Sequence, residues 1–144
     1  MAVGDRVDPY RVYSFRVEID GITRAGFREC SGLDVSQDPI DYREGTDPHT
    51  VRKLPGLLKY SHITLKWGIS DDHEFWDWQK KAVDGKVTRL NGSIILVDDA
   101  GEEKKRWNFR EGWPTKWTGP SFNATSNEVA IETLEIVHEG IVLA

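Results

Sequence analysis

Alternation of apolar and polar residues constrains the fold of this chain more than any other feature of the sequence. In the segment 12–19, VYSFRVEI, every second side chain is apolar, which is the period of a strand with one buried face. The face expected to be buried consists of Tyr13, Phe15, Val17 and Ile19. Asp20-Gly21 follows directly, and Asp-Gly is a strong signal for a two-residue hairpin turn. This part of the chain therefore predicts a β-hairpin.

Further segments extend the pattern of strands. The return strand of the hairpin is expected within 22–33, with Gly26 as a candidate bulge. In the segment 57–69, LLKYSHITLKWGI, a single long strand is expected, and Ile63, Leu65 and Trp67 share its apolar face. Three more strands are expected at 89–99, 104–113 and 115–118, with a turn at DDAGEE between the first two.

The C-terminal segment 127–144, NEVAIETLEIVHEGIVLA, carries two competing signals. Its glutamates recur at helical spacing, whereas its many β-branched residues favour a strand. We predict a long strand. Ile131 belongs to one phase of the alternation and Leu134 and Ile136 belong to the other, so a bulge near Thr133 is expected to bring both phases to one face. This interpretation places Ile131 in the core.

One segment predicts a helix, at about 71–84. Phe75, Trp78 and Ala82 fall on one side at helical spacing. Asp71 and Asp72 stand where helix N-caps belong, and Gly85 is a natural stop.

These elements predict a mainly β fold: about seven strands and one helix in a sandwich or partly closed barrel with the helix at its side. No βαβ alternation or internal repeat is evident. The chain has 144 residues, of which 38% are hydrophobic and 30% charged, and this suits a single domain spanning 1–144.

Charge and composition exclude several classes of function. A formal net charge of -5 argues against specific nucleic-acid binding and against attraction to an anionic membrane surface. The longest apolar run, at 94–97, is too short to span a bilayer, and MAVGDRVDPY does not resemble a secretory signal peptide. With Cys30 as the single cysteine, no internal disulfide is expected. We expect folding and assembly in the bacterial cytoplasm.

A search for chemistry finds no catalytic, cofactor-binding or metal-binding site. DDHE at 71–74 contains potential metal ligands, but adjacent helix residues diverge around the axis, so a solvated first turn is the favoured interpretation. The four histidines are scattered outside any H-x-x-x-H or H-E-x-x-H motif. Cys30 is expected to be a buried structural cysteine, and Ser31 lacks the G-x-S-x-G frame of a nucleophile. We therefore do not expect an enzyme.

The segment 42–60, YREGTDPHTVRKLPGLLKY, is too long and irregular for an ordinary turn. It mixes charges, two prolines and two glycines with apolar residues. Connections of this length without regular structure are usually functional or disordered.

The chain resembles the tail-tube proteins of contractile phage tails and phage-tail-like contractile injection systems. The resemblance rests on stretches that run in order from Asp8 to Gly140, among them DPYRVYSFRVEIDGI, YREG, RKLPGLLKY, SIILVDDAGEE and NEVAIETLEIVHEG. It implies an Hcp-like fold of two packed antiparallel sheets with a helix alongside. It also implies a role as the structural protomer of a hollow inner tube, built from hexameric rings stacked inside a sheath.

The resemblance further implies that 42–60 is an extended arm that reaches a neighbouring subunit or ring. Its expected interface anchors are Tyr42, Leu54, Leu57 and Leu58, and its expected rim charges are Arg43, Glu44, Arg52 and Lys53. The implied partners are further copies of the chain, the sheath protein, baseplate and tube-terminating proteins, and cargo in the lumen. No cofactor is implied.

A second hypothesis remains open at this point: a small β-barrel that binds a ligand in a pocket lined by its aromatic residues. The six tryptophans of the chain are compatible with this hypothesis, although intramolecular core positions are favoured for Trp113 and Trp117.

Overall fold

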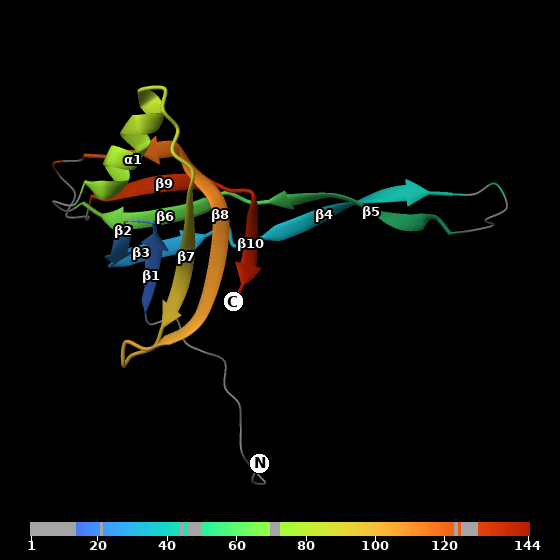
Figure 1. Cartoon of the computed structure of the whole chain (residues 1–144), viewed down its shortest axis with the longest axis horizontal. Coiled ribbons are helices and arrows are strands. Elements are labelled where there is room, and N and C mark those ends of the chain that lie inside the picture. Colours follow the sequence, from blue (N-terminus) through green and yellow to red (C-terminus); the bar gives the residue numbers. More distant parts are fainter. Residues whose placement is uncertain are drawn as a thin grey trace, which may run out of the picture.

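The computed structural model describes residues 14–20, 22–43, 45, 50–69, 73–122, 124 and 130–144. In these ranges the chain forms ten strands and one helix (Figure 1). The helix is α1 (Glu74–Val83). The strands are β1 (Ser14–Ile19), β2 (Ile22–Ala25), β3 (Phe27–Ser31), β4 (Val35–Tyr42), β5 (Arg52–Tyr60), β6 (Ile63–Gly68), β7 (Leu90–Val97), β8 (Glu103–Thr118), β9 (Ile131–Val137) and β10 (Gly140–Leu143).

The strands form one bent sheet and one separate ribbon. Eight strands join in the order β2-β1-β7-β8-β9-β6-β3, with β10 paired to β8 beside that path. The first part of β8 pairs with β7 and β10, and its last part pairs with β9. The first layer is thus β2, β1, β7, β10 and the first part of β8, and the second layer is β3, β6, β9 and the last part of β8.

Strand β8 joins the two layers. It bends near Glu111, whose φ is 53°, and the layers fold over one another so that their strands cross in Figure 1. The prediction of two packed antiparallel layers with one helix is confirmed. The barrel is not closed, because within the described residues the end strands β2 and β3 each pair with a single neighbour.

The core lies between the layers and follows the predicted alternation. Val17 and Ile19 of β1 are buried, and so are Ile63, Leu65 and Trp67 of β6. The other buried members of this cluster are Phe75, Trp78, Ile94, Phe109, Leu134 and Ile136. Aromatic rings fill the interior by packing on one another: the Trp67 ring centroid lies 5.3 Å from that of Phe75 and 5.4 Å from that of Trp117. Trp113 and Trp117 pack against the core, as expected.

Helix α1 covers one end of the layers. It begins at Glu74 and ends at Val83, within the predicted span of 71–84, and it buries Phe75 and Trp78. The Trp78 indole Nε1 donates a hydrogen bond of 2.8 Å to the backbone carbonyl of Thr88. The N-cap position is occupied by His73, which makes no side-chain cap, and the predicted capping residues Asp71 and Asp72 lie outside the described residues.

Two predictions of strand continuity are wrong. Gly26 is not a bulge within one strand: it separates β2, which pairs with β1, from β3, which pairs with β6, so the chain changes layer there. The segment 57–69 is likewise two strands. Its first residues end β5 and its last residues form β6, because β5 pairs with β4 outside the bent sheet.

The C-terminal segment is extended as predicted, but the residues that it buries in the core differ from those expected. Leu134 and Ile136 are fully buried, whereas Ile131 at the start of β9 is half-buried, so the prediction of a core position for Ile131 is wrong. The segment divides into β9 and β10 because the chain crosses from the second layer to the first. The short strand expected at 115–118 is the end of the 16-residue β8.

Strands β4 and β5 form a two-stranded antiparallel ribbon that projects far beyond the packed layers (Figure 1). We call this ribbon the arm. It contains most of the predicted arm at 42–60 and begins earlier, at Val35.

Across the described ranges, no helix has both the length and the apolar character needed to cross a membrane.

Candidate assembly surface

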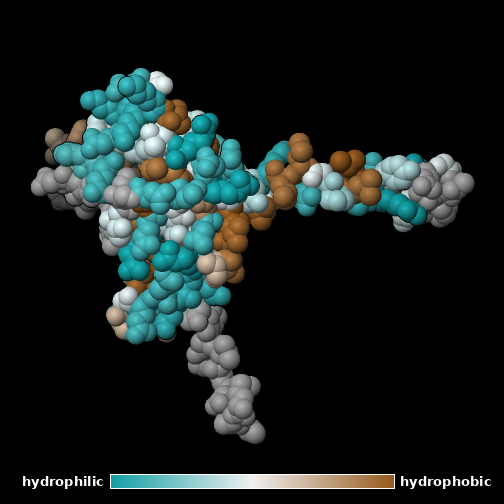
Figure 2. Space-filling view, in the orientation of Figure 1, coloured by the Kyte–Doolittle hydropathy of each residue, from teal (hydrophilic) through white to brown (hydrophobic). Residues whose placement is uncertain are grey.

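The arm carries an unusual concentration of exposed apolar side chains. Of the predicted anchors, Leu57 is 77% exposed, Leu58 56%, and Tyr42 and Leu54 43% each. In a space-filling view, hydrophobic patches interrupt the hydrophilic surface along the arm and at its junction with the body (Figure 2). An isolated two-stranded ribbon has only marginal stability in water, so these side chains need a surface to pack against.

Three apolar residues of this surface were missed by sequence reasoning. Val35, Ile40 and Val51 are all exposed, and Ile40 lies opposite Leu54 in the ribbon. The sequence predicts no strand around Val35 and Ile40, because Gln37-Asp38-Pro39 resembles a break. The signal that could have identified them is the β-branched character of both residues on either side of that break.

The predicted rim charges have different environments. Lys53 forms an ion pair with Asp41 across the ribbon. Arg52 lies opposite Tyr42, and Arg43 follows the end of β4. Glu44 lies outside the described residues.

A second cross-strand ion pair stands closer to the body. The Lys59 Nζ lies 2.7 Å from Asp38 Oδ2, and this hydrogen bond raises the pKa of Lys59. Both ion pairs of the arm are solvent-exposed, so they contribute more to the register of the ribbon than to its stability.

The root of the arm is held by contacts on both of its strands. The Ser61 backbone N–H donates a hydrogen bond of 3.3 Å to the Asp34 carbonyl. The Tyr60 ring packs on the His138 ring at 5.5 Å between centroids, and the His138 Nε2 lies 3.1 Å from the Ser61 carbonyl. Burial lowers the pKa of His138, so its neutral form is favoured at the root.

Gly32 lets the chain pass closely at this root. Its φ is +89°, and a Cβ at this position would lie 1.9 Å from the His62 carbonyl oxygen. An L-residue with a side chain would combine backbone strain with a steric clash. The root therefore positions the arm by a close backbone crossing.

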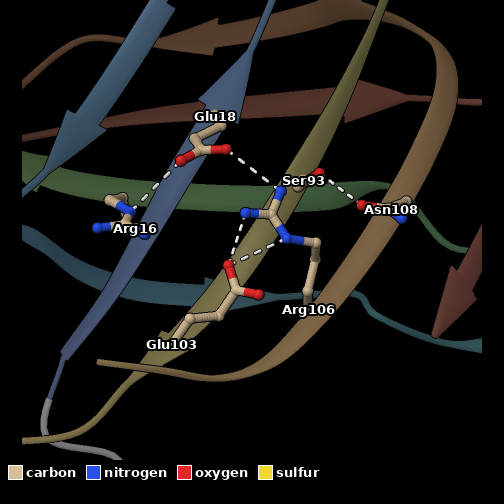
Figure 3. A network of polar contacts seen from close by, with 6 residues as sticks. All are labelled: Arg16, Glu18, Ser93, Glu103, Arg106 and Asn108. Atoms are coloured by element: carbon tan, nitrogen blue, oxygen red, sulfur yellow. Dashed lines mark hydrogen bonds and ion pairs between the residues drawn. The ribbon is translucent and has the colours of Figure 1, made fainter. Parts of the chain in front are cut away.

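The outward face of the first layer is polar and internally charge-paired (Figure 3). The Arg106 guanidinium lies 2.6 Å from Glu103 Oε1 and 3.2 Å from Glu18 Oε2. Arg16 Nε lies 3.6 Å from the same Glu18 carboxylate. The hydrogen bond from Arg106 lowers the pKa of Glu103. Ile95 is fully buried on this face, and its register partners on β1 and β8 are Arg16 and Arg106.

The same face continues into an open groove of about 710 Å³. It is lined by charged and amide side chains such as Glu18, Arg106 and Asn108, with Phe109 and Val142 among them. The Ser93 hydroxyl donates a hydrogen bond of 2.6 Å to Asn108 Oδ1 beside the groove. This face combines hydrated polar groups with nearly balanced charge.

The described residues do not assemble a recognisable reaction centre. Among them, no group of three or more His, Cys, Asp or Glu side chains could hold a metal ion. Cys30 is half-buried against the core, and burial raises the pKa of its thiol to about 12, which disfavours the reactive thiolate. The most prominent features among the described residues are thus the exposed apolar side chains of the arm and the polar face of the first layer.

Comparisons with known proteins find a matching family and similar solved structures. The family described as T4-like virus tail tube protein gp19 matches residues 11–142. A chain of the sheath-tube complex of the extracellular contractile injection system PVC is 33% identical with a TM-score of 0.85, covering 94% of this chain and 91% of that one. A chain of the tube-terminating cap of the anti-feeding prophage is 31% identical with a TM-score of 0.84, covering 100% and 99%.

A more distant similarity concerns the fold alone. Hcp1 from Flavobacterium johnsoniae is 17% identical with a TM-score of 0.59, covering 91% of this chain and 94% of that one. Among curated protein sequences, none matches this chain significantly.

Proposed function

The chain belongs to the T4-like virus tail tube protein family and is a structural tube protomer, and from this premise we propose that six copies close into a ring and that rings stack into a hollow tube. The observation that carries the proposal is the arm. It presents exposed leucines on a ribbon that reaches beyond the body, and an arm of this kind suits contact with neighbouring copies.

Ring closure is proposed to use the edges of the first layer. Within the described residues, β2 pairs with β1 alone and β10 pairs with β8 alone, so each leaves one edge available. Strand β10 also exposes Val142 and Leu143. Joining such edges around a ring would satisfy their backbone groups and remove the tendency of open edges to aggregate.

The arm is proposed to link each copy to its neighbours in the tube. Its contact residues would be the predicted set together with Val35 and Ile40, which are exposed on the same ribbon. The predicted set is Tyr42, Arg43, Glu44, Arg52, Lys53, Leu54, Leu57 and Leu58.

The lumen wall is proposed to be the polar face of the first layer. A hydrated face whose arginines and glutamates pair with one another offers few unpaired charges to a passing cargo. The proposed role is thus a conduit, without a catalytic step.

The similar structures support a proposal for partners and location. Those structures include a sheath-tube complex, a tube-terminating cap and a baseplate, and we propose a sheath, a terminator and a baseplate as partners of this chain too. Assembly would take place in the bacterial cytoplasm, and the tube would then act as part of a phage-tail-like particle.

Electron microscopy and native mass spectrometry of the purified chain test the proposal. We expect six-copy rings and stacked tubes. A matched control replaces 36–59 by a two-residue Asn-Gly turn between Val35 and Tyr60, which are paired at the arm root. This variant is expected to keep the body folded and to lose tubes. A compact monomer that gains stability with an apolar ligand would instead support a ligand-binding module.

A further inference from the structure

The arm exposes apolar side chains on both of its faces. Cross-strand partners in a ribbon point to the same side, and successive residues of a strand point to opposite sides. The register of β4 and β5 therefore divides the arm into two faces. The Leu58 face consists of Val35, Gln37, Pro39, Asp41, Lys53, Pro55, Leu58 and Tyr60. The Leu57 face consists of Ser36, Asp38, Ile40, Tyr42, Arg52, Leu54, Leu57 and Lys59.

A β-bulge determines which leucines share a face. The register shifts between Gln37 and Pro39, so that Gly56 and Leu57 together lie opposite Asp38. The extra residue places Leu54 and Leu57 on one face although they are three positions apart. Gly56 permits the close approach, because a Cβ there would lie 2.4 Å from the Asp38 carbonyl oxygen and 3.2 Å from Ile40 Cγ1.

The edges of the arm are less suited to docking than its faces. Pro39 lies opposite Pro55, and neither residue has a backbone N–H, so the two cannot exchange hydrogen bonds. They must form a non-hydrogen-bonded pair, in which the backbone polar groups point outward from the ribbon. Each outer edge therefore lacks a donor at this position, and a strand added along either edge would meet a gap.

Within the described residues, four of the five charged side chains on the two faces form ion pairs within the arm, and Arg52 on the Leu57 face does not. The Leu58 face holds the Lys53–Asp41 pair, and the Leu57 face holds the Lys59–Asp38 pair. A surface that covers either face does not need to supply a counter-charge for these residues. Each face is therefore able to pack against an ordinary mixed protein surface.

We infer that the arm lies between two further copies of this chain, one packed against the Leu58 face and the other against the Leu57 face. The ribbon is one layer thick, and a single flat neighbour would leave one set of exposed leucines in water. In a tube that this chain forms without a sheath, the surfaces within reach are those of other copies. The inference rests on the proposed function and goes beyond it by requiring two neighbours for each arm.

Site-directed spin labelling distinguishes one covered face from two. Leu57→Cys and Leu58→Cys each carry a nitroxide on one face, and each labelled chain is co-assembled at low fraction with excess unlabelled chain. The high pKa of the half-buried Cys30 keeps its thiol protonated at neutral pH, and the wild-type chain treated with the same label measures the remaining background.

Both labels are expected to be mobile in the unassembled chain and strongly immobilised in tubes. Tubes in which either label keeps its free mobility would overturn the inference, since that face would then be uncovered. The proposed function is tested separately by whether the unlabelled chain forms tubes at all. The two ideas therefore fail in different measurements.

Discussion

Shortening Leu57 is expected to weaken tube assembly without weakening the fold. In Leu57→Ala about three carbon groups are lost, each worth about 0.8 kcal/mol when buried. The side chain is 77% exposed in the isolated chain, so about 1.8 kcal/mol of the burial energy becomes available only on assembly. Since about 1.4 kcal/mol corresponds to a factor of ten, the critical concentration for tube formation should rise about 20-fold.

The assay is sedimentation of tubes over a range of protein concentrations, with thermal unfolding of the unassembled chain measured alongside. The melting temperature of Leu57→Ala should equal that of the wild type, because the side chain is mostly in water before assembly. The matched control is Val83→Ala on helix α1, which truncates a side chain that is 71% exposed but lies outside the arm. It should leave the critical concentration unchanged, and the melting temperature should not fall, because alanine has a higher helix propensity than valine. An unchanged critical concentration for Leu57→Ala would refute the assignment of Leu57 to an interface.

Three further predictions concern stability. Ile136→Ala should lower the free energy of unfolding in denaturant by about 2–5 kcal/mol, because its side chain is fully buried. Ile131→Ala should lower it clearly less, because Ile131 is half-buried. Equal losses would contradict the burial of Ile136 and the partial exposure of Ile131. Gly32→Ala should destabilise the fold by at least about 1–3 kcal/mol through backbone strain, and the clash with the His62 carbonyl oxygen should add to this loss. An unchanged free energy of unfolding would contradict the close backbone crossing at the arm root. The pKa of His138 is lowered by burial, so below its unfolded value of about 6.5 the unfolded state binds more protons and stability falls as the pH falls. The loss of unfolding free energy between pH 7 and 5.5 should be smaller in His138→Gln; an identical pH dependence would refute a role for this residue.

Local alternation predicted much of the fold because it reports directly on which side chains share a face. The burial of Val17 and Ile19 in β1, and of Leu65 and Trp67 in β6, follows from a period of two that needs no knowledge of the partner strand. The helix was predictable for a similar reason, since Phe75 and Trp78 repeat at helical spacing. The leucine anchors of the arm were expected from the resemblance to tail-tube proteins and not from a local pattern.

The sequence by itself therefore indicated most of the strands, the helix and an irregular segment at 42–60 that is too long for an ordinary turn. The tertiary structure decided which side chains of β9 face the core. Ile136 is buried and Ile131 is only half-buried, because β9 pairs with β6 and β8 in a fixed register. It also decided that the arm begins at Val35 and that a bulge at Gly56 places Leu54 on the same face as Leu57. Register depends on partners distant in the sequence, and a shift of one residue exchanges the two faces of a strand, so neither result was available from local patterns.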